Sequence, residues 1–281
     1  MSPATQSSDA VVYVYGIARG NALADHTAPL VEGIIPGTPV ELLRVGNLAL
    51  VMNRASKEIF APTGAGAAGD AALVTEMALA HHHVLASLAL VCTVAPVKFG
   101  ALCSDVNDVL TLFTRSGATF EHALDRVDRA QEWGIKLFAD VEACRIAAAS
   151  APAVAALKAE IAAASRGKAF FLAKKLRATI DQEIRARLDI QAQSTHRHLA
   201  AQARESAPNP IRRSAASLNG KVSWLILDSA YLVDKDREAE FHQTLADLGR
   251  SLAAEGLALK LTGPWPPYSF AAVDTEGAAD G

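Results

Sequence analysis

The chain has 281 residues, a length that fits one large domain or two ordinary ones. Its 27 Lys and Arg residues nearly balance 30 Asp and Glu residues, and the formal net charge is -3, so no basic excess is available to drive binding to nucleic acid. The hydrophobic fraction of 51% is enough for a sizeable core and excludes collagenous and strongly charged disordered classes.

No membrane span or targeting segment is expected. The low-charge stretch 65–100 is interrupted by Asp70, Glu76, three histidines and Pro96, so it lacks about 20 uninterrupted apolar residues. The first nine residues are polar and lack the basic start and apolar middle of a secretory signal. We therefore expect a cytoplasmic protein without a membrane partner.

The first domain is predicted to span residues 1–131 as a mixed α/β unit. Residues 11–17 are β-branched or aromatic on both faces, which is typical of a central strand. Two short strands at 40–44 and 47–54 predict a hairpin, and a long helix follows from about residue 70. A strand is expected at 93–99, with helices at 105–115 and 119–131 separated at Gly117.

The second domain is predicted to span residues 132–262. It begins with a strand at 133–139, an alanine-rich helix at 142–164 and a long helix from 167 to about 202. A strand at 222–233, a helix at 235–255 and a strand at 257–261 complete it. This order of strands and helices indicates a ferredoxin-like α/β sandwich with an enlarged helical crossover, so the fold class is α+β.

The long helix of this domain carries a row of apolar residues from Leu172 to Leu188, spaced by four. Such a row winds around a helix whose repeat is near 3.6 residues, so we expect it to contact the sheet at one end and another partner at the other. Basic residues lie between these apolar positions. They form either a solvated helix face or a surface for an acidic partner.

No arrangement of catalytic, cofactor-binding or metal-binding residues is evident. A G-x-G-x-x-G occurs at 64–69, but it follows Pro62 rather than a strand. His81, His82 and His83 point about 100° apart on a helix and cannot converge on one ion. His81 shares the apolar stripe and is predicted to be a hydrogen-bonded core residue, with His82 and His83 exposed.

Two other features have alternative interpretations. Asp228 either faces solvent from the strand at 222–233 or is a buried acid paired with a base. The C-terminal tail, 263–281, opens with GPWPPYSF, whose three prolines and aromatic rings predict a stiff extended segment that cannot be a helix. It is either a packed clasp or a partner-binding strip.

This C-terminal segment resembles the signature of the gas vesicle GvpL/GvpF family. Residues 12–17 resemble the opening strand of that family, and residues 225–233 resemble its hydrophobic C-terminal strand. The helix with His81 and the following residues 95–100 resemble a helix that leads into a P-V-R-F-G strand. Lys98 replaces the commoner arginine there, and Asp228 stands where a neutral residue such as asparagine is expected.

The resemblance implies a non-enzymatic accessory or minor component of the gas vesicle in the cytoplasm. It implies association with the hydrophobic shell protein, limiting its aggregation during nucleation, and with other accessory proteins. It also implies two α+β domains, the second ferredoxin-like with the tail packed on its sheet. The candidate protein-binding residues are Pro96, Lys98, Phe99, Trp265, Tyr268 and Phe270.

Two other functions compete with this interpretation. A ferredoxin-like small-molecule-binding or enzymatic domain would have a closed pocket with converging polar groups near Asp228 or His81. Simple incorporation into the shell, with no action on free subunits, is the other alternative.

Overall fold

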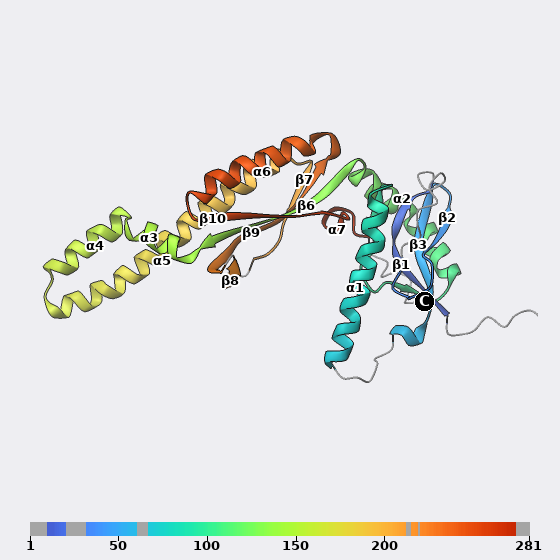
Figure 1. Cartoon of the computed structure of the whole chain (residues 1–281), viewed down its shortest axis with the longest axis horizontal. Coiled ribbons are helices and arrows are strands. Elements are labelled where there is room, and N and C mark those ends of the chain that lie inside the picture. The colour runs from blue at the N-terminus through green and yellow to red at the C-terminus, as the bar shows by residue number, and fades with distance from the viewer. Residues whose placement is uncertain (1–9, 21–31, 61–66, 212–214, 219, 274–281) are drawn as a thin grey trace, which may run out of the picture. The chain divides into compact units, whose positions relative to one another are not determined.

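The computed structural model describes residues 10–20, 32–60, 67–211, 215–218 and 220–273 (Figure 1). The described residues form two compact units. One unit contains the chain up to Glu132 together with the residues from Trp265 onward, and the other contains Trp133–Pro264. Residues 263–265 of the tail still belong to the strand Leu257–Trp265 of the second sheet, whereas the described residues from Trp265 on belong to the first unit. The expectation that the tail packs on the second sheet is therefore wrong for residues 266–273.

The first sheet is antiparallel and has β1 at its centre. Its path is β2-β3-β1-β4, and β5 also pairs with β1. The strands are β1 (Ala10–Arg19), β2 (Glu41–Val45), β3 (Leu48–Ser56), β4 (Val94–Pro96) and β5 (Leu102–Cys103). β1 is buried from Val11 to Ala18, which confirms the predicted central strand. The predicted hairpin is also present, because Val45 pairs with Leu48 across a turn in which Gly46 has a positive φ of 60°.

Two long helices contact this sheet, α1 (Ala67–Ala89) and α2 (Val106–Val127), and a short 3₁₀ turn, η1 (Lys57–Phe60), follows β3. α2 runs unbroken through Gly117, so the two helices predicted there are one. The Asp105 side chain caps its start, accepting from the backbone of Asn107 and Asp108. Its buried face continues on both sides of Gly117, including Phe113 and Phe120, and this packing offsets the roughly 1 kcal/mol that a mid-helix glycine costs.

The C-terminal segment forms a short helix, α7 (Tyr268–Ala271), that contacts α2 and β4. The expectation that this segment cannot be a helix is wrong for its second half. Pro267 is the last proline, so the residues after it retain their N–H groups, and Ala271 donates to the Pro267 carbonyl at 2.9 Å. Val273 then donates to the Pro96 carbonyl at 2.9 Å and forms a parallel bridge with Val97.

The second sheet follows the path β10-β6-β9-β7, with β8 pairing with β9. The strands are β6 (Ala130–Asp140), β7 (Glu205–Pro208), β8 (Ala215–Leu218), β9 (Lys221–Asp234) and β10 (Leu257–Trp265). β6 alternates buried and partly buried residues from Trp133 to Ala139, as predicted. β7 and β8 pair antiparallel with β9. Both lie in a stretch that the sequence predicts as a connector.

The first crossover of this unit contains α3 (Val141–Ala149), α4 (Pro152–Ala163) and α5 (Arg166–Ala200). The single helix predicted at 142–164 is two helices, because the chain breaks before Pro152, which stands at the first turn of α4. α5 packs against α4 near its start, and its Ile184 and Leu188 join the core that covers the second sheet. The predicted winding of the apolar row is therefore confirmed.

Within the described ranges, no single helix is long and apolar enough to cross a membrane. α3 and α4 are long and apolar enough only when they are taken together, and the two helices are bent by 64° at the break between them.

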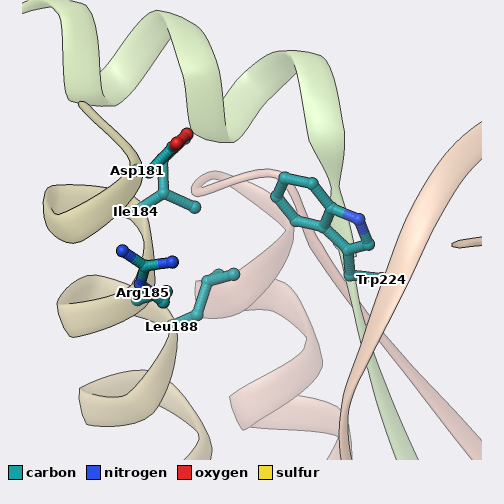
Figure 2. A pocket seen from close by; sticks show the side chains of 5 residues that line it. All are labelled: Asp181, Ile184, Arg185, Leu188 and Trp224. Carbon is teal, nitrogen blue, oxygen red and sulfur yellow. The ribbon is translucent and has the colours of Figure 1, made fainter. Parts of the chain in front are cut away.

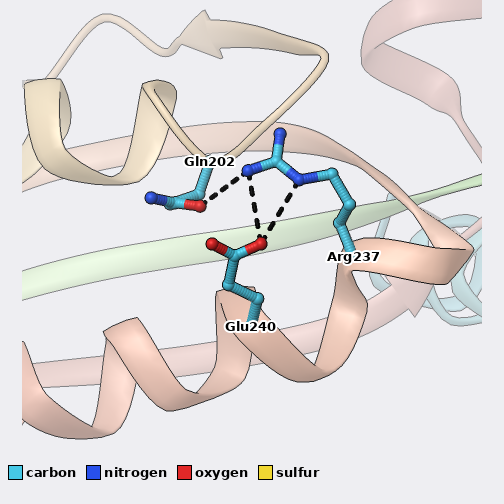
Figure 3. A network of polar contacts seen from close by, with 3 residues as sticks. All are labelled: Gln202, Arg237 and Glu240. Carbon is cyan, nitrogen blue, oxygen red and sulfur yellow. Dashed lines mark hydrogen bonds and ion pairs between the residues drawn. The ribbon is translucent and has the colours of Figure 1, made fainter.

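The second crossover begins with the short 3₁₀ turn η2 (Lys235–Arg237) and continues as α6 (Glu238–Ala253). Arg237 links the end of α5 to the start of α6 (Figure 3). Its Nη2 donates to Gln202 Oε1 at 2.8 Å, and its Nε and Nη2 donate to Glu240 Oε2 at 3.4 Å. The two covering helices of this unit are thus joined by polar side chains as well as by their apolar faces.

Candidate protein-binding site

The three consecutive histidines of α1 lie in three different environments. His81 is 2% exposed, and its Nδ1 lies 2.8 Å from the Tyr13 hydroxyl of β1. Its ring also contacts the rings of Tyr15 and Phe99. The prediction that His81 is a hydrogen-bonded core residue is therefore confirmed.

The surroundings of His81 determine its protonation. Burial lowers the pKa of His81 to about 4, although the nearby Val97 carbonyl partly opposes this shift, so the ring is neutral at pH 7. Burial also raises the pKa of Tyr13 above its usual value, which keeps its hydroxyl protonated. The Gly100 N–H points to the Tyr13 oxygen at 3.4 Å, so we assign Tyr13 as the donor to His81 Nδ1.

His82 was expected to be exposed, and the structure shows it half-buried. The Trp265 ring lies 5.0 Å from the His82 ring, centroid to centroid, and the Tyr268 ring lies 6.2 Å away. The Tyr268 hydroxyl is 3.5 Å from His82 Nδ1. Burial lowers the pKa of His82, with a smaller contribution from the neighbouring His83. His83 itself is exposed, as predicted.

A buried carboxylate holds the C-terminal segment in place. Glu132 accepts hydrogen bonds from the backbone N–H and the hydroxyl of Ser269, both at 2.8 Å, and thereby binds the first turn of α7. Burial raises the pKa of Glu132, while the bonds from Ser269 oppose that shift. The sequence offered no signal for this contact beyond an acid beside Trp133 at the start of an apolar strand.

The six residues proposed from the sequence separate into a buried group and an exposed group. Pro96 and Phe270 are buried and Tyr268 is half-buried, so these three attach the C-terminal segment to the first unit. Phe99 is 42% exposed, Trp265 is 38% exposed, and Lys98 is exposed as well. The interpretation of the tail as a packed clasp thus describes residues 268–273, whereas the other group remains accessible to a partner.

Phe99 and Trp265 approach the same part of α1, although they are far apart in sequence. Phe99 contacts His81 and Trp265 contacts His82, which are adjacent residues. The backbone of β4 is less accessible here, because Val273 already uses the Pro96 carbonyl. A partner would therefore meet aromatic side chains at this site more readily than a free strand edge.

The second unit contains a pocket of about 210 Å³ between α5 and β9, lined by Asp181, Ile184, Arg185, Leu188 and Trp224. The side chains of Ile184 and Leu188 extend from α5 toward the Trp224 ring (Figure 2). The volume is smaller than the roughly 300–1,000 Å³ usual for small-molecule sites.

Asp228 is neither fully solvent-facing nor fully buried, so it combines features of the two alternatives that the sequence leaves open. Its side chain is half-buried, 3.3 Å from Lys136 Nζ, and its Oδ1 accepts a hydrogen bond from Asn209 at 3.2 Å.

In the part of the chain that the structure describes, no cluster of three or more His, Cys, Asp or Glu side chains is arranged to hold a metal ion.

Comparison with known proteins agrees with this architecture. The family model described as "Gas vesicle synthesis protein GvpL/GvpF" matches residues 11–272. The chain belongs to the gas vesicle GvpL/GvpF family. This is a family of gas vesicle proteins and not a known enzyme family.

Relatives and solved structures cover nearly the whole chain. Gas vesicle protein L of Streptomyces sp. (strain CB03234) is 30% identical over 276 residues, covering 96% of each chain. Gas vesicle protein F of the same strain is 27% identical, covering 92% of this chain and 98% of the relative.

The fold is similar to the crystal structure of GvpF from Anabaena sp. PCC7120, with a TM-score of 0.68, 17% identity and coverage of 94% of this chain and 97% of that chain. It is also similar to GvpF from Microcystis aeruginosa, with a TM-score of 0.63, 19% identity and coverage of 94% and 99%.

Proposed function

We propose that this protein assists gas vesicle assembly without enzyme activity, by binding the hydrophobic shell protein and limiting its aggregation. The observation that carries the proposal is the family match, which extends over both units. We place the protein at the gas vesicle in the cytoplasm, with other gas vesicle accessory proteins as further partners and no nucleic-acid or membrane partner.

The proposed contact surface is the exposed group Lys98, Phe99 and Trp265. Large aromatic side chains contribute strongly to protein–protein interfaces because they bury much apolar area and lose few rotamers on binding. Phe99 contacts the buried His81, and Trp265 contacts the half-buried His82 and precedes a segment held by Glu132, which supports their positions before a partner arrives.

Light scattering of purified shell protein, with and without this protein, tests the function. The intact chain is expected to delay aggregation at stoichiometric ratios. If it neither binds the shell protein nor delays its aggregation, the proposed function is wrong.

A pair of variants tests the surface separately. Phe99→Ala combined with Trp265→Ala is expected to weaken shell-protein binding about tenfold or more, as loss of interface anchors does. Leu110→Ala on α2 removes a side chain of similar exposure, 40%, and serves as the matched control. Equal activity of the double variant and the control would exclude this surface while leaving the function intact.

We also propose that the chain divides into domains near residue 132, and that the second is a ferredoxin-like sandwich with an enlarged helical crossover. The strand path β10-β6-β9-β7, with helices in both crossovers, supports this assignment. Limited proteolysis of the intact chain is expected to leave residues 133–264 as a resistant fragment. Rapid degradation of that region would contradict the domain assignment.

A further inference from the structure

The crossover helices of the second unit form a hairpin that extends beyond the sheet. α4 and the first part of α5 pack against each other, and Figure 1 shows them projecting away from the strands of their own unit. Their contact buries Val154, Leu157 and Leu172. The outer side of this hairpin, residues 152–177, therefore has no role in covering the sheet.

Two adjacent phenylalanines lie on that outer side. Phe170 is 74% exposed and Phe171 is 73% exposed, and their rings contact each other with centroids 5.9 Å apart. Because Leu172 is buried whereas both rings are largely exposed, neither ring is needed for packing of the hairpin. A pair of exposed aromatic rings on a rigid helix is typical of an interaction site.

The same part of α5 is strongly basic, in contrast to the whole chain with its formal charge of -3. Residues 166–177 contain no acid and five cations, which are Arg166, Lys168, Lys174, Lys175 and Arg177. Lys168 pairs with Glu160 at 3.1 Å. The other four are exposed, and within the described residues none has a carboxylate at ion-pair distance.

The cations and the rings alternate along the helix. Arg166 and Lys174 stand four residues before and after Phe170, and Lys175 stands four residues after Phe171, so each ring has a basic neighbour on its own face. A helix that lies in a lipid surface needs a continuous apolar face, and these cations interrupt it. The pattern suits a protein surface that combines small apolar pockets with carboxylates.

We propose that the hairpin of residues 152–177 is a docking site for an acidic amphipathic helix of a partner protein. Apolar side chains of that helix cover Phe170 and Phe171, and its carboxylates pair with the surrounding cations. These four cations, which have no carboxylate at ion-pair distance among the described residues, are the observation that selects an acidic occupant, because opposite charge steers association and determines partner choice. The site is separate from the Phe99 and Trp265 surface and does not depend on it.

The test measures binding of a synthetic 20-residue helical peptide to the full chain by fluorescence anisotropy. The peptide carries Leu at i, i+3, i+4 and i+7 and Glu on its remaining face, and a control peptide has the same composition with Leu distributed around the helix. We expect the amphipathic peptide to bind more tightly than the control, and its affinity to fall as salt is raised.

Variants locate the site on the protein. Phe170→Ala combined with Phe171→Ala, and Lys174→Glu combined with Lys175→Glu, are each expected to weaken binding about tenfold or more. Ile190→Ala removes a side chain of the same helix that is 65% exposed and is expected to change binding less than about twofold. Circular dichroism confirms that each variant folds.

Three results would overturn the proposal. One is equal binding of both peptides, and another is binding that survives both double variants. The third is a different occupant of the site. Tight binding of phosphatidylserine vesicles that depends on Phe170 and Phe171 would indicate a lipid surface. Self-association of this chain, detected by sedimentation and abolished by the Phe variants, would indicate a second copy.

Discussion

Each unit places a tyrosine of a central strand against a histidine of a covering helix. In the first unit the Tyr13 hydroxyl lies 2.8 Å from His81 Nδ1, and in the second the Tyr231 hydroxyl lies 2.9 Å from His196 Nδ1. Both tyrosines are fully buried. The histidines differ, since His81 is almost completely buried whereas His196 is only partly buried.

The difference shows that burial, more than the types of the paired residues, determines how such a contact affects stability. His81 is surrounded by aromatic rings, so its loss of hydration is only partly compensated and its pKa falls to about 4. His196 can exchange its protein partner for water. We therefore expect the stability of the first unit to depend on pH and on the Tyr13 hydroxyl. The stability of the second unit should depend less on its own tyrosine–histidine pair.

Acidification is expected to have the largest effect. The pKa of His81 is depressed in the folded state, so between about pH 6.5 and 4 the unfolded chain binds more protons and the stability of the first unit is lost as pH falls. The loss from this group amounts to on the order of 3 kcal/mol. Hydrogen–deuterium exchange, measured on peptides from β1 and from β9, reports the stability of each unit separately.

A matched pair of variants assigns this pH effect. His81→Gln should reduce the pH dependence of exchange in β1, whereas His83→Gln, on the exposed face of the same helix, should leave it unchanged. An unaltered slope in His81→Gln would show that other groups are responsible.

Tyr13→Phe is expected to destabilise the first unit by about 2 kcal/mol, because it leaves the buried Nδ1 of His81 without its hydrogen bond. Faster exchange confined to peptides of the first sheet would report this loss. A change below about 0.5 kcal/mol would mean that water reaches the ring and that His81 is less enclosed than its burial indicates.

Tyr231→Phe is expected to cost less, about 1 kcal/mol, because the partly exposed His196 can bond to water instead. The same exchange experiment, read on β9 peptides, measures it. If this variant is as costly as Tyr13→Phe, burial of the histidine is not what distinguishes the two pairs.

His196→Gln is expected to have the smallest effect, within about 0.5 kcal/mol, since a partly exposed polar residue replaces another. Thermal unfolding of the variant beside the parent protein provides the check. A large decrease in Tm would show that the buried Tyr231 hydroxyl requires its hydrogen bond with His196.

Local patterns predicted much of the fold. The unbroken apolar run of β1, the hairpin at Gly46 and the alternation of β6 all follow from side-chain periodicity, which each segment carries by itself. His81 was also assigned correctly, because it shares a helical stripe with Met77 and Val84.

The errors have two causes, which are packing that overrides a local signal and a local signal that outweighs helix propensity. Gly117 does not break α2, because the buried face on either side of it is continuous. Conversely, the alanines of 142–164 have high helix propensity, yet Pro152 divides the segment into α3 and α4. For the candidate site, the sequence proposed Phe99 and Trp265 but gave no sign that His82 contacts Trp265 or that Glu132 holds the segment after it.

The sequence by itself thus determined the long strands, most of the helices, the buried His81 and the family, since these depend on residues close together along the chain. Only the tertiary structure decided where the C-terminal segment belongs and which residues hold it. Its contacts join Ser269 to Glu132, 137 positions apart, and Tyr268 to His82, 186 positions apart. No local pattern encodes such pairs, because they form only when the folded backbone brings distant segments within hydrogen-bond reach.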